Sequence, residues 1–175
     1  MKPIHPHDSM RGHFAWHLYD YMEKDKNIML VCVDLGYGMF DAIRDGFPDQ
    51  VIITGASEQA AMGMAVGLAL SGKIPLVYSI TPFLLWRSAE TLRLYLNHEN
   101  IPVKLIGSGR DTDYEHDGYS HDATDAHAFL ELLPNIHQYF PEKEYVAGKS
   151  FTVAEGLERL LYNGKPTFMS LKRKW

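Results

Sequence analysis

The sequence predicts an α/β protein with three layers, in which helices cover both faces of a mostly parallel sheet of about six strands. Short, wholly apolar segments such as Ile28–Val33 alternate along the chain with segments whose apolar residues recur at helical spacing. Strands this apolar are buried on both faces, as in a parallel sheet covered by helices. The 175 residues have the length of one domain and can bury a substantial core.

The expected elements follow one another without an internal repeat or a low-complexity linker, so we predict a single domain over residues 1–175. The first helix should begin behind the cap candidates Asp8 and Ser9, and Ser57 is a plausible cap for the second. Thr81 and Pro82 should open the third helix, since proline is favoured at the first helical position. Strands are expected at 28–33, 51–54, 76–80, 103–106, 136–140 and 166–171, and helices at 10–22, 57–71, 81–99, 121–133 and 151–162.

Composition excludes several classes of protein. The 22 acidic residues outnumber the 17 basic ones, and a net charge of −5 argues against nucleic acid as the main partner. No apolar run approaches transmembrane length, and the first residues do not resemble a signal peptide, so we expect no membrane association. Cys32 is the single cysteine and sits in an apolar run, which predicts a buried thiol and fits a reducing, cytoplasmic location.

Glu58 is the main candidate for chemistry from the residues alone. In parallel sheets, ligands bind beyond the carboxyl ends of the strands, and Glu58 follows the predicted second strand directly. Its simplest role is that of a first-turn acid stabilised by the helix dipole. However, a wholly apolar helix follows it, and a partly desolvated carboxyl there can hold a proton near neutral pH and share it with a ligand.

The helix behind Glu58 is apolar all the way round from Ala60 to Leu70 and should be buried on every side. Gly63 and Gly67 lie four residues apart, so one face lacks side chains and permits the close approach of another backbone. Two arrangements satisfy this pattern equally well: a subunit interface, and a central helix packed inside the monomer.

A series of spaced motifs extends from these residues over nearly the whole chain. It comprises Asp34-Leu35-Gly36, Phe47-Pro48-Asp49, Gly55-Ala56-Ser57-Glu58-Gln59, Gly72-Lys73-Ile74-Pro75, Phe83 with Arg87, Val103-Lys104-Leu105-Ile106-Gly107, Asp117-Gly118-Tyr119-Ser120-His121 and Pro134-Asn135. In this order the motifs resemble the pyrimidine-binding domain of the transketolase and deoxyxylulose-phosphate synthase group of thiamine-diphosphate enzymes. The resemblance implies the thiamine-diphosphate-binding fold, present here as a stand-alone chain.

The resemblance also assigns roles to individual side chains. Glu58 would hydrogen-bond the N1′ nitrogen of the cofactor's aminopyrimidine and promote loss of the thiazolium C2 proton, and Phe83 would stack on the pyrimidine. Asp34 would line the thiazolium pocket, and Arg87 would belong to the same cofactor site. Without the resemblance, Phe83 would be an ordinary core residue and Asp34 a turn residue.

Two further residues are implied at the substrate side of the site. Asp117 and His121 would face the substrate, where an imidazole can polarise a carbonyl or shuttle a proton. Taken alone, His121 is one of nine histidines and would more often be a surface residue.

The sequence departs from the family in two ways. It contains no Gly-Asp-Gly motif, which in the family holds magnesium and the diphosphate on a separate domain. The resemblance therefore implies a partner chain with that motif, in a homodimer or heterotetramer. In addition, three positions at which the family contacts substrate phosphate fall on Gly38, Gly109 and Phe140; Arg110 or Arg87 are the available substitutes.

The resulting prediction is the pyrimidine-binding subunit of a two-chain, transketolase-like enzyme that acts on a small molecule by ketol transfer or a related carbon–carbon cleavage or ligation. A subunit of a two-chain 2-oxoacid decarboxylase is one alternative, although the early segments resemble that branch less. A non-catalytic relic that serves as a binding module is another, although Glu58, Asp117 and His121 are all present.

Overall fold

The computed structural model describes residues 1–142 and 152–174. Within them, six strands form one parallel sheet in the order β2-β1-β3-β4-β6-β5. The strands are β1 (Ile28–Cys32), β2 (Val51–Ile53), β3 (Ile74–Ile80), β4 (Lys104–Ser108), β5 (His137–Tyr139) and β6 (Thr167–Leu171). In the sheet, β2 lies on one side of β1, and β3 and the later strands lie on the other side. The strand order therefore reverses between β1 and β3, which is where open α/β sheets form their ligand crevice.

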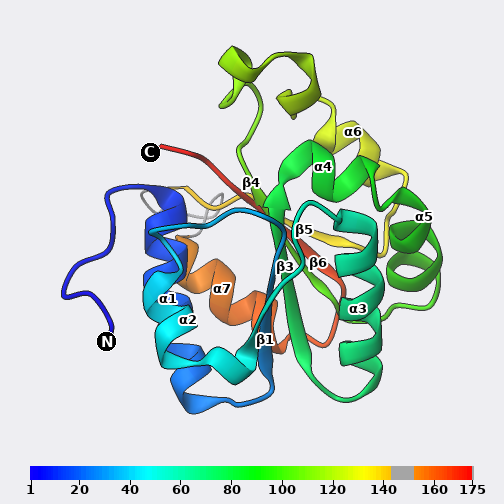
Figure 1. Cartoon of the computed structure of the whole chain (residues 1–175). Helices are drawn as coiled ribbons and strands as arrows, with labels where there is room; N and C mark the ends of the chain where they lie inside the picture. Colours follow the sequence, from blue (N-terminus) through cyan, green and yellow to red (C-terminus); the bar gives the residue numbers. More distant parts are fainter. Residues whose placement is uncertain (143–151, 175) are drawn as a thin grey trace.

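Helices cover both faces of the sheet, as Figure 1 shows, and the predicted three-layer architecture is confirmed. The helices are α1 (Met10–Lys24), α2 (Asp41–Gly46), α3 (Glu58–Leu70), α4 (Thr81–Trp86), α5 (Ala89–Thr91), α6 (Ala126–Glu131) and α7 (Val153–Tyr162). One apolar core lies between the sheet and α1, α2 and α7, and a second lies between the sheet and α3 to α6. Cys32 is buried in the first core, and burial raises its pKa to about 12, so it is an inert structural thiol.

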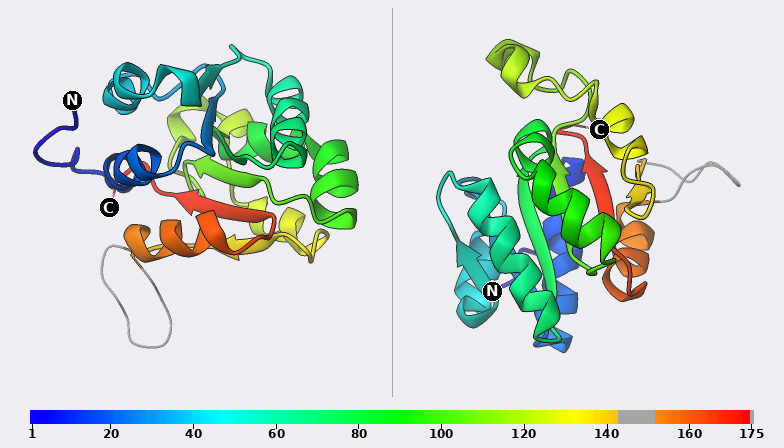
Figure 2. Two further views of the ribbon diagram at one scale, coloured as in Figure 1. Left: turned by 90° about the horizontal axis from the view of Figure 1, so that it is seen from below. Right: turned by 90° about the vertical axis from the view of Figure 1, so that its right-hand side faces the viewer.

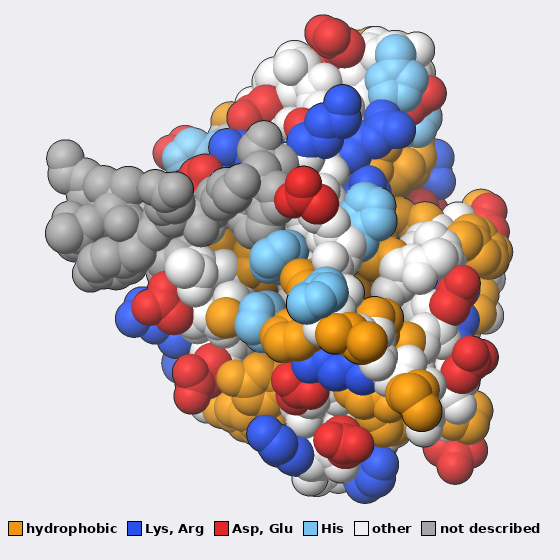
Figure 3. Space-filling view, turned by 90° about the vertical axis from the view of Figure 1, so that its left-hand side faces the viewer, with side chains coloured by type: hydrophobic (Ala, Val, Ile, Leu, Met, Phe, Trp, Pro, Cys, Tyr) orange, Lys and Arg blue, Asp and Glu red, His pale blue; other side chains and the backbone are white. Residues whose placement is uncertain are grey.

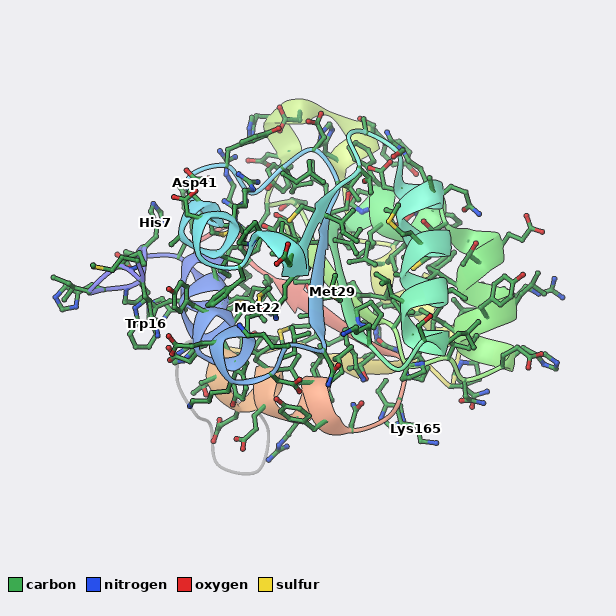
Figure 4. The ribbon with its side chains drawn as sticks, turned by 60° about the horizontal axis from the view of Figure 1, so that its bottom comes forward. His7, Trp16, Met22, Met29, Asp41 and Lys165 are labelled. Atoms are coloured by element: carbon green, nitrogen blue, oxygen red, sulfur yellow. The ribbon has the colours of Figure 1, made fainter. Side chains whose placement is uncertain are left out.

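The first helix begins where the sequence predicts. The Ser9 hydroxyl accepts a hydrogen bond from the Gly12 amide at 3.0 Å and so caps α1. Figure 4 shows Met22 of α1 pointing inward, and this side chain is fully buried. Residues 1–8 form an arm across α1 and α2, on the side that faces the viewer in Figure 3, where histidine and hydrophobic side chains lie beside one another.

The prediction of a single helix over 81–99 is wrong, because a turn at Arg87 and Ser88 interrupts the helix. The segment after the break forms α5 and then a π-helix at Leu92–His98, whose wider turns shift the following side chains. The break coincides with two contacts to α3: Arg87 bonds Glu58, and the Thr91 hydroxyl accepts a hydrogen bond from the Gln59 amide at 2.8 Å. Tertiary contacts therefore override local helix propensity here.

The helix predicted over 121–133 is also shorter than expected. Asp122 accepts hydrogen bonds from the backbone and hydroxyl of Thr124, and Ala123 pairs with Asp111 across an antiparallel bridge. Both interactions hold the backbone away from helical geometry, so α6 begins only at Ala126. The last helix, α7, begins at Val153 behind a capping box at Thr152, and its predicted start at residue 151 lies outside the described residues.

Within the single chain, the helix behind Glu58 is not buried on every side. Met64 is 42% exposed and Leu70 is 70% exposed, whereas the opposite face of α3 packs on the sheet. A Cβ atom added at Gly63 or Gly67 would meet nothing within 4 Å, so the glycine face is open. The alternative of a helix enclosed within the monomer is thereby excluded.

The segment between β4 and α6 projects beyond the carboxyl edge of the sheet, at the top of Figure 1 and in the right-hand view of Figure 2. It contains two short 3₁₀ turns, Glu115–Asp117 and Tyr119–His121. Among the described residues, no helix is long and apolar enough to cross a membrane.

Candidate functional site

Glu58 lies at the carboxyl edge of the sheet, at the first residue of α3. β2 ends at Ile53, and a short turn leads directly into the helix. Ser57 occupies the cap position, but its hydroxyl donates to the Thr54 carbonyl at 2.8 Å instead of capping the helix. The Glu58 side chain is only 5% exposed, so its carboxylate requires partners within the protein.

Both carboxylate oxygens of Glu58 have such partners. The Ser79 hydroxyl, at the end of β3, donates to Oε1 at 3.2 Å. The Arg87 guanidinium donates to Oε2 at 2.9 Å and compensates the buried charge. The Arg87 side chain is itself half exposed, so this ion pair lies at the boundary between the protein interior and solvent.

Phe83 and His121 complete this cluster. The Arg87 guanidinium lies over the Phe83 ring, 3.8 Å from its centroid. The His121 ring stands edge-on to the Phe83 ring, with 4.8 Å between centroids. Four residues singled out from the sequence therefore meet in space: a buried carboxylate, a guanidinium, an aromatic ring and an imidazole. Such a set can bind a flat, cationic or hydrogen-bonding heterocycle and move a proton beside it.

Asp34 and Asp117 do not join this cluster. Asp34 follows β1 in a left-handed conformation, with φ of 45°, and its exposed carboxylate accepts a hydrogen bond from Tyr37 at 3.4 Å. Asp117 lies in the projecting segment and pairs with its neighbour His116 at 3.2 Å. Both residues follow strands at the carboxyl edge of the sheet, but in the described part of the chain neither forms a hydrogen bond or ion pair with Glu58.

A cavity of about 390 Å³ lies at the point where the strand order reverses. It is lined by His7, Ser9, Arg11, Leu35, Gly36, Tyr37, Gly38, Met39, Ile80 and Tyr114. Arg11 brings a positive charge to it, and the guanidinium donates through one nitrogen to the Ser108 hydroxyl at 3.1 Å and to the Tyr114 hydroxyl at 2.9 Å. Beneath this region, burial raises the pKa of Tyr78 to about 12, and the nearby charge of Arg11 partly opposes that shift.

Sequence reasoning missed Arg11, Tyr114 and Ser79. The signal for Arg11 was available, because a helix that connects to a parallel strand runs antiparallel to it, so the first turn of α1 must lie at the carboxyl edge. Nothing in the sequence pattern indicated Tyr114, whose contact with Arg11 joins residues 103 positions apart.

The proposed substitute Arg110 is fully engaged inside the protein. Its side chain donates to Ser170, to the Pro141 carbonyl and to Glu142, with the Glu142 ion pair at 2.7 Å. It also lies over the ring of Phe140, 5.4 Å from the centroid. Arg110 therefore ties β4 to β6 and to the exit of β5, and it does not face the cavity.

Comparison with protein families gives a match to the transketolase pyrimidine-binding domain over residues 9–173. Among curated proteins, a 6-deoxy-6-sulfo-D-fructose transketolase subunit from a Clostridium species is 25% identical over 158 residues, which cover 90% of this chain and 47% of the relative. One of the subunits of an apulose-4-phosphate transketolase, from Actinobacillus succinogenes, is 32% identical over 95 residues, which cover 54% of this chain and 30% of the relative. The chain thus spans less than half the length of these relatives.

Solved structures show the same fold. A split-gene transketolase, described as an "inactive beta4 tetramer", superposes with a TM-score of 0.78. The superposition covers 95% of this chain and 52% of that chain, at 22% identity. The transketolase from Leishmania mexicana superposes with a TM-score of 0.80 over 95% of this chain and 25% of its own, at 18% identity.

Proposed function

We propose, from the premise that this chain belongs to the transketolase pyrimidine-binding domain family, that it is the pyrimidine-binding subunit of a two-chain, thiamine-diphosphate-dependent transferase. The observation that carries the proposal is the buried carboxylate of Glu58 at the carboxyl edge, with the Phe83 ring in the same cluster. Two relatives are named as transketolase subunits, which supports a division of the enzyme between chains.

The residues of this cluster fit the aminopyrimidine half of the cofactor. A carboxylate on a side chain that is 5% exposed can hold a proton against a ring nitrogen without competition from bulk water. Phe83 is half buried and offers a ring face that is now covered by the Arg87 guanidinium, which is flat and cationic. An aminopyrimidine is flat as well, and it would contact the same two groups as the guanidinium, the Glu58 carboxylate and the Phe83 ring.

The proposed mechanism divides the work among the side chains of this chain. The bound thiazolium supplies the carbon nucleophile for ketol transfer. Glu58 holds or gives the proton at the pyrimidine N1′, and Phe83 fixes the ring's orientation. The His121 ring lies 4.8 Å from the Phe83 ring between centroids. From there, His121 moves a proton to or from the substrate oxygen. Arg11 attracts an anionic substrate into the cavity, whose lining residue Tyr114 lies 6.1 Å from His121 between ring centroids.

The open face of α3 supports the need for a partner. Ala60, Gly63, Met64, Gly67 and Leu70 are exposed along this face, which we call the α3 outer face. Glu58 begins the same helix, so a chain packed on the α3 outer face would also close the site above Glu58. We assign the diphosphate and magnesium to that partner, a chain with a Gly-Asp-Gly motif.

Calorimetry with and without such a partner tests the proposal. The isolated chain should bind thiamine diphosphate weakly, because a single pyrimidine contact yields little free energy against the entropy lost on binding. Adding the partner chain and magnesium should produce tight binding together with ketol-transferase activity. Tight, magnesium-dependent binding by the isolated chain would refute the two-chain proposal, and a correctly assembled complex without activity would favour a binding module.

A further inference from the structure

The arm formed by residues 1–8 is held against α1 at an inner anchor, where His7 meets Gly12. The His7 carbonyl and Cβ lie so close to Gly12 that a Cβ atom added at this glycine would overlap both. Glycine inside a helix lowers stability relative to alanine, and here it permits the close approach of the arm. The His7 carbonyl also accepts a hydrogen bond from the Ser9 amide at 2.7 Å, and the His7 Nδ1 lies 3.1 Å from the Ser9 hydroxyl.

The outer anchor of the arm is a clamp on the Trp16 indole. The Lys2 ammonium lies over the indole ring, 3.4 Å from its centroid, and forms an ion pair with Asp20 at 2.6 Å. The indole N–H donates to the Pro3 carbonyl at 3.0 Å. Because Trp16 and Asp20 are four residues apart on α1, one face of the helix supplies both partners of Lys2. Figure 4 shows Trp16 and His7 on the same side of the molecule as the arm.

Between the two anchors the arm spans a hollow instead of packing closely on the helices. Ile4 is 86% exposed although it is apolar. Beneath the arm lies a cavity of about 270 Å³, which we call the arm hollow, with Tyr19, Ala42 and Ile43 among its lining residues. An arm that is fixed at two ends, by contacts near the surface, can detach without unpacking the core.

The arm hollow and the cavity of about 390 Å³ at the carboxyl edge share a wall. His7 of the arm lines both, and so do Gly38 and Met39 from the segment between β1 and α2. Gly38 and Met39 lie in a turn, outside any helix or strand, and Gly38 has φ of +75°. The position of this wall therefore depends on the segments beside it, and one of these is the arm.

We propose that the arm is a strap that fixes the shared wall, with Gly12 and Trp16 as its positioning residues. While both anchors hold, His7 and Met39 separate the cavity from the arm hollow. When the arm detaches, the two spaces join, water enters, and the cavity holds a small molecule less tightly. The inference rests on the proposed function only in taking the occupant of the cavity to be a substrate of ketol transfer.

Thiol labelling of the full chain tests the strap without cofactor or partner. Cys32 is the single cysteine and is buried, so Ala42→Cys introduces the reactive thiol, in the arm hollow. Iodoacetamide should modify it about three- to tenfold faster when Lys2→Met removes the clamp, as expected for the loss of a cation–π contact and a partly exposed ion pair. Lys2→Arg keeps both contacts and should retain the slow rate. Lys24→Met, at an exposed lysine of α1, is the matched control.

The inner anchor and the shared wall are tested with two further variants. Gly12→Ala should also accelerate labelling of Ala42→Cys, because the added Cβ displaces the His7 backbone while the helix gains propensity. Met39→Cys reports on the shared wall, and its labelling should rise in both Gly12→Ala and Lys2→Met. If neither variant accelerates labelling at Ala42→Cys, the arm is not a docked strap. If labelling rises at Ala42→Cys alone, the arm does not fix the wall of the cavity.

The assembled enzyme provides the functional readout. With D-ribose as the acceptor, Lys2→Met should raise KM about two- to fivefold with little change in kcat, because the looser cavity loses binding that is equal in the ground and transition states. Lys2→Arg should restore KM. An unchanged KM in a variant with faster labelling at both thiols would overturn the link between the arm and the substrate. A parent complex without ketol transfer would refute the proposed function, and the labelling rates would still decide the strap.

Discussion

The Arg87 guanidinium lies on the Glu58 carboxylate at 2.9 Å and over the Phe83 ring at 3.8 Å. These are the two groups proposed to hold the aminopyrimidine. On that proposal, the guanidinium occupies the place of the ring in the free chain and would have to leave Glu58 when the cofactor binds. Half of the Arg87 side chain is exposed, so it can swing into solvent without unpacking the core.

Replacing Arg87 should therefore tighten cofactor binding, whereas it should lower the thermal stability of the free chain. Arg87→Met leaves Glu58 buried without its cation, which lowers the melting temperature of the isolated chain. In the assembled enzyme the cofactor no longer displaces an ion pair, and its affinity should rise about two- to fivefold, the usual value of a partly exposed pair. Arg93→Met, on the exposed side of the following π-helix, is the control. Weaker cofactor binding in Arg87→Met would show that Arg87 supports the bound cofactor directly.

Glu58→Gln should stop proton removal from the cofactor without unfolding the chain. Glutamine preserves the shape and can still bond Ser79, but it cannot give or take the proton at N1′. Deuterium exchange at the thiazolium C2 position in the assembled enzyme should slow by at least about 100-fold. The exposed Glu90→Gln serves as the matched control. An unchanged exchange rate in Glu58→Gln would remove Glu58 from the mechanism.

His121→Ala should spare cofactor binding and impair turnover. The loss expected for a missing general acid or base is about 10²- to 10⁴-fold in kcat. His98→Ala, at a histidine whose side chain is 78% exposed, should have no effect. If cofactor affinity falls in His121→Ala and the rate with bound cofactor does not, His121 supports Phe83 structurally instead of acting on the substrate.

The isolated chain should self-associate through the α3 outer face, because its exposed apolar residues would otherwise face water. Met64→Asp places a charge between Gly63 and Gly67 and should weaken association at least about tenfold, since desolvating unpaired charges in an interface is costly. Analytical ultracentrifugation measures this directly. Leu132→Asp, at a site 75% exposed just after α6, should leave association unchanged. If both variants self-associate equally strongly, the contact between copies does not involve the α3 outer face.

Lys104 should make stability depend on pH above neutrality. Burial lowers its pKa to about 8, and its ammonium donates to Asn163 at 2.8 Å and to the Lys165 carbonyl at 2.6 Å. The unfolded chain keeps this proton up to the ordinary lysine pKa of 10.5, so between about pH 8 and 10.5 the unfolded state binds more protons and stability rises with pH.

Urea unfolding at pH 7.5 and pH 10 measures this contribution. Relative to Lys104→Met, the wild-type free energy of unfolding should rise by about 2–3 kcal/mol over the interval, as expected for a shift of this size. The exposed Lys165→Met is the control, since its side chain points to solvent in Figure 4. A difference between wild type and Lys104→Met that is independent of pH would contradict the prediction.

The sequence alone determined the order of the six strands along the chain, the parallel sheet and the position of Glu58 at its carboxyl edge. Each of these rests on local information. Apolar periodicity distinguishes strand from helix within a few residues, and a continuous apolar strand such as β1 must be buried on both faces. Glu58 follows β2 so closely that its place at the edge depends only on the connection between a strand and a helix.

Only the tertiary structure decided which side chains meet. Arg87 contacts Glu58 at the place where the helical segment is interrupted, and Tyr114 contacts Arg11 where α1 and the segment after β4 meet at the same edge. The exposure of the α3 outer face likewise depends on what packs beside it. These contacts join residues 29 and 103 positions apart, and side-chain pairing over such separations depends on how whole elements pack, which no local pattern encodes.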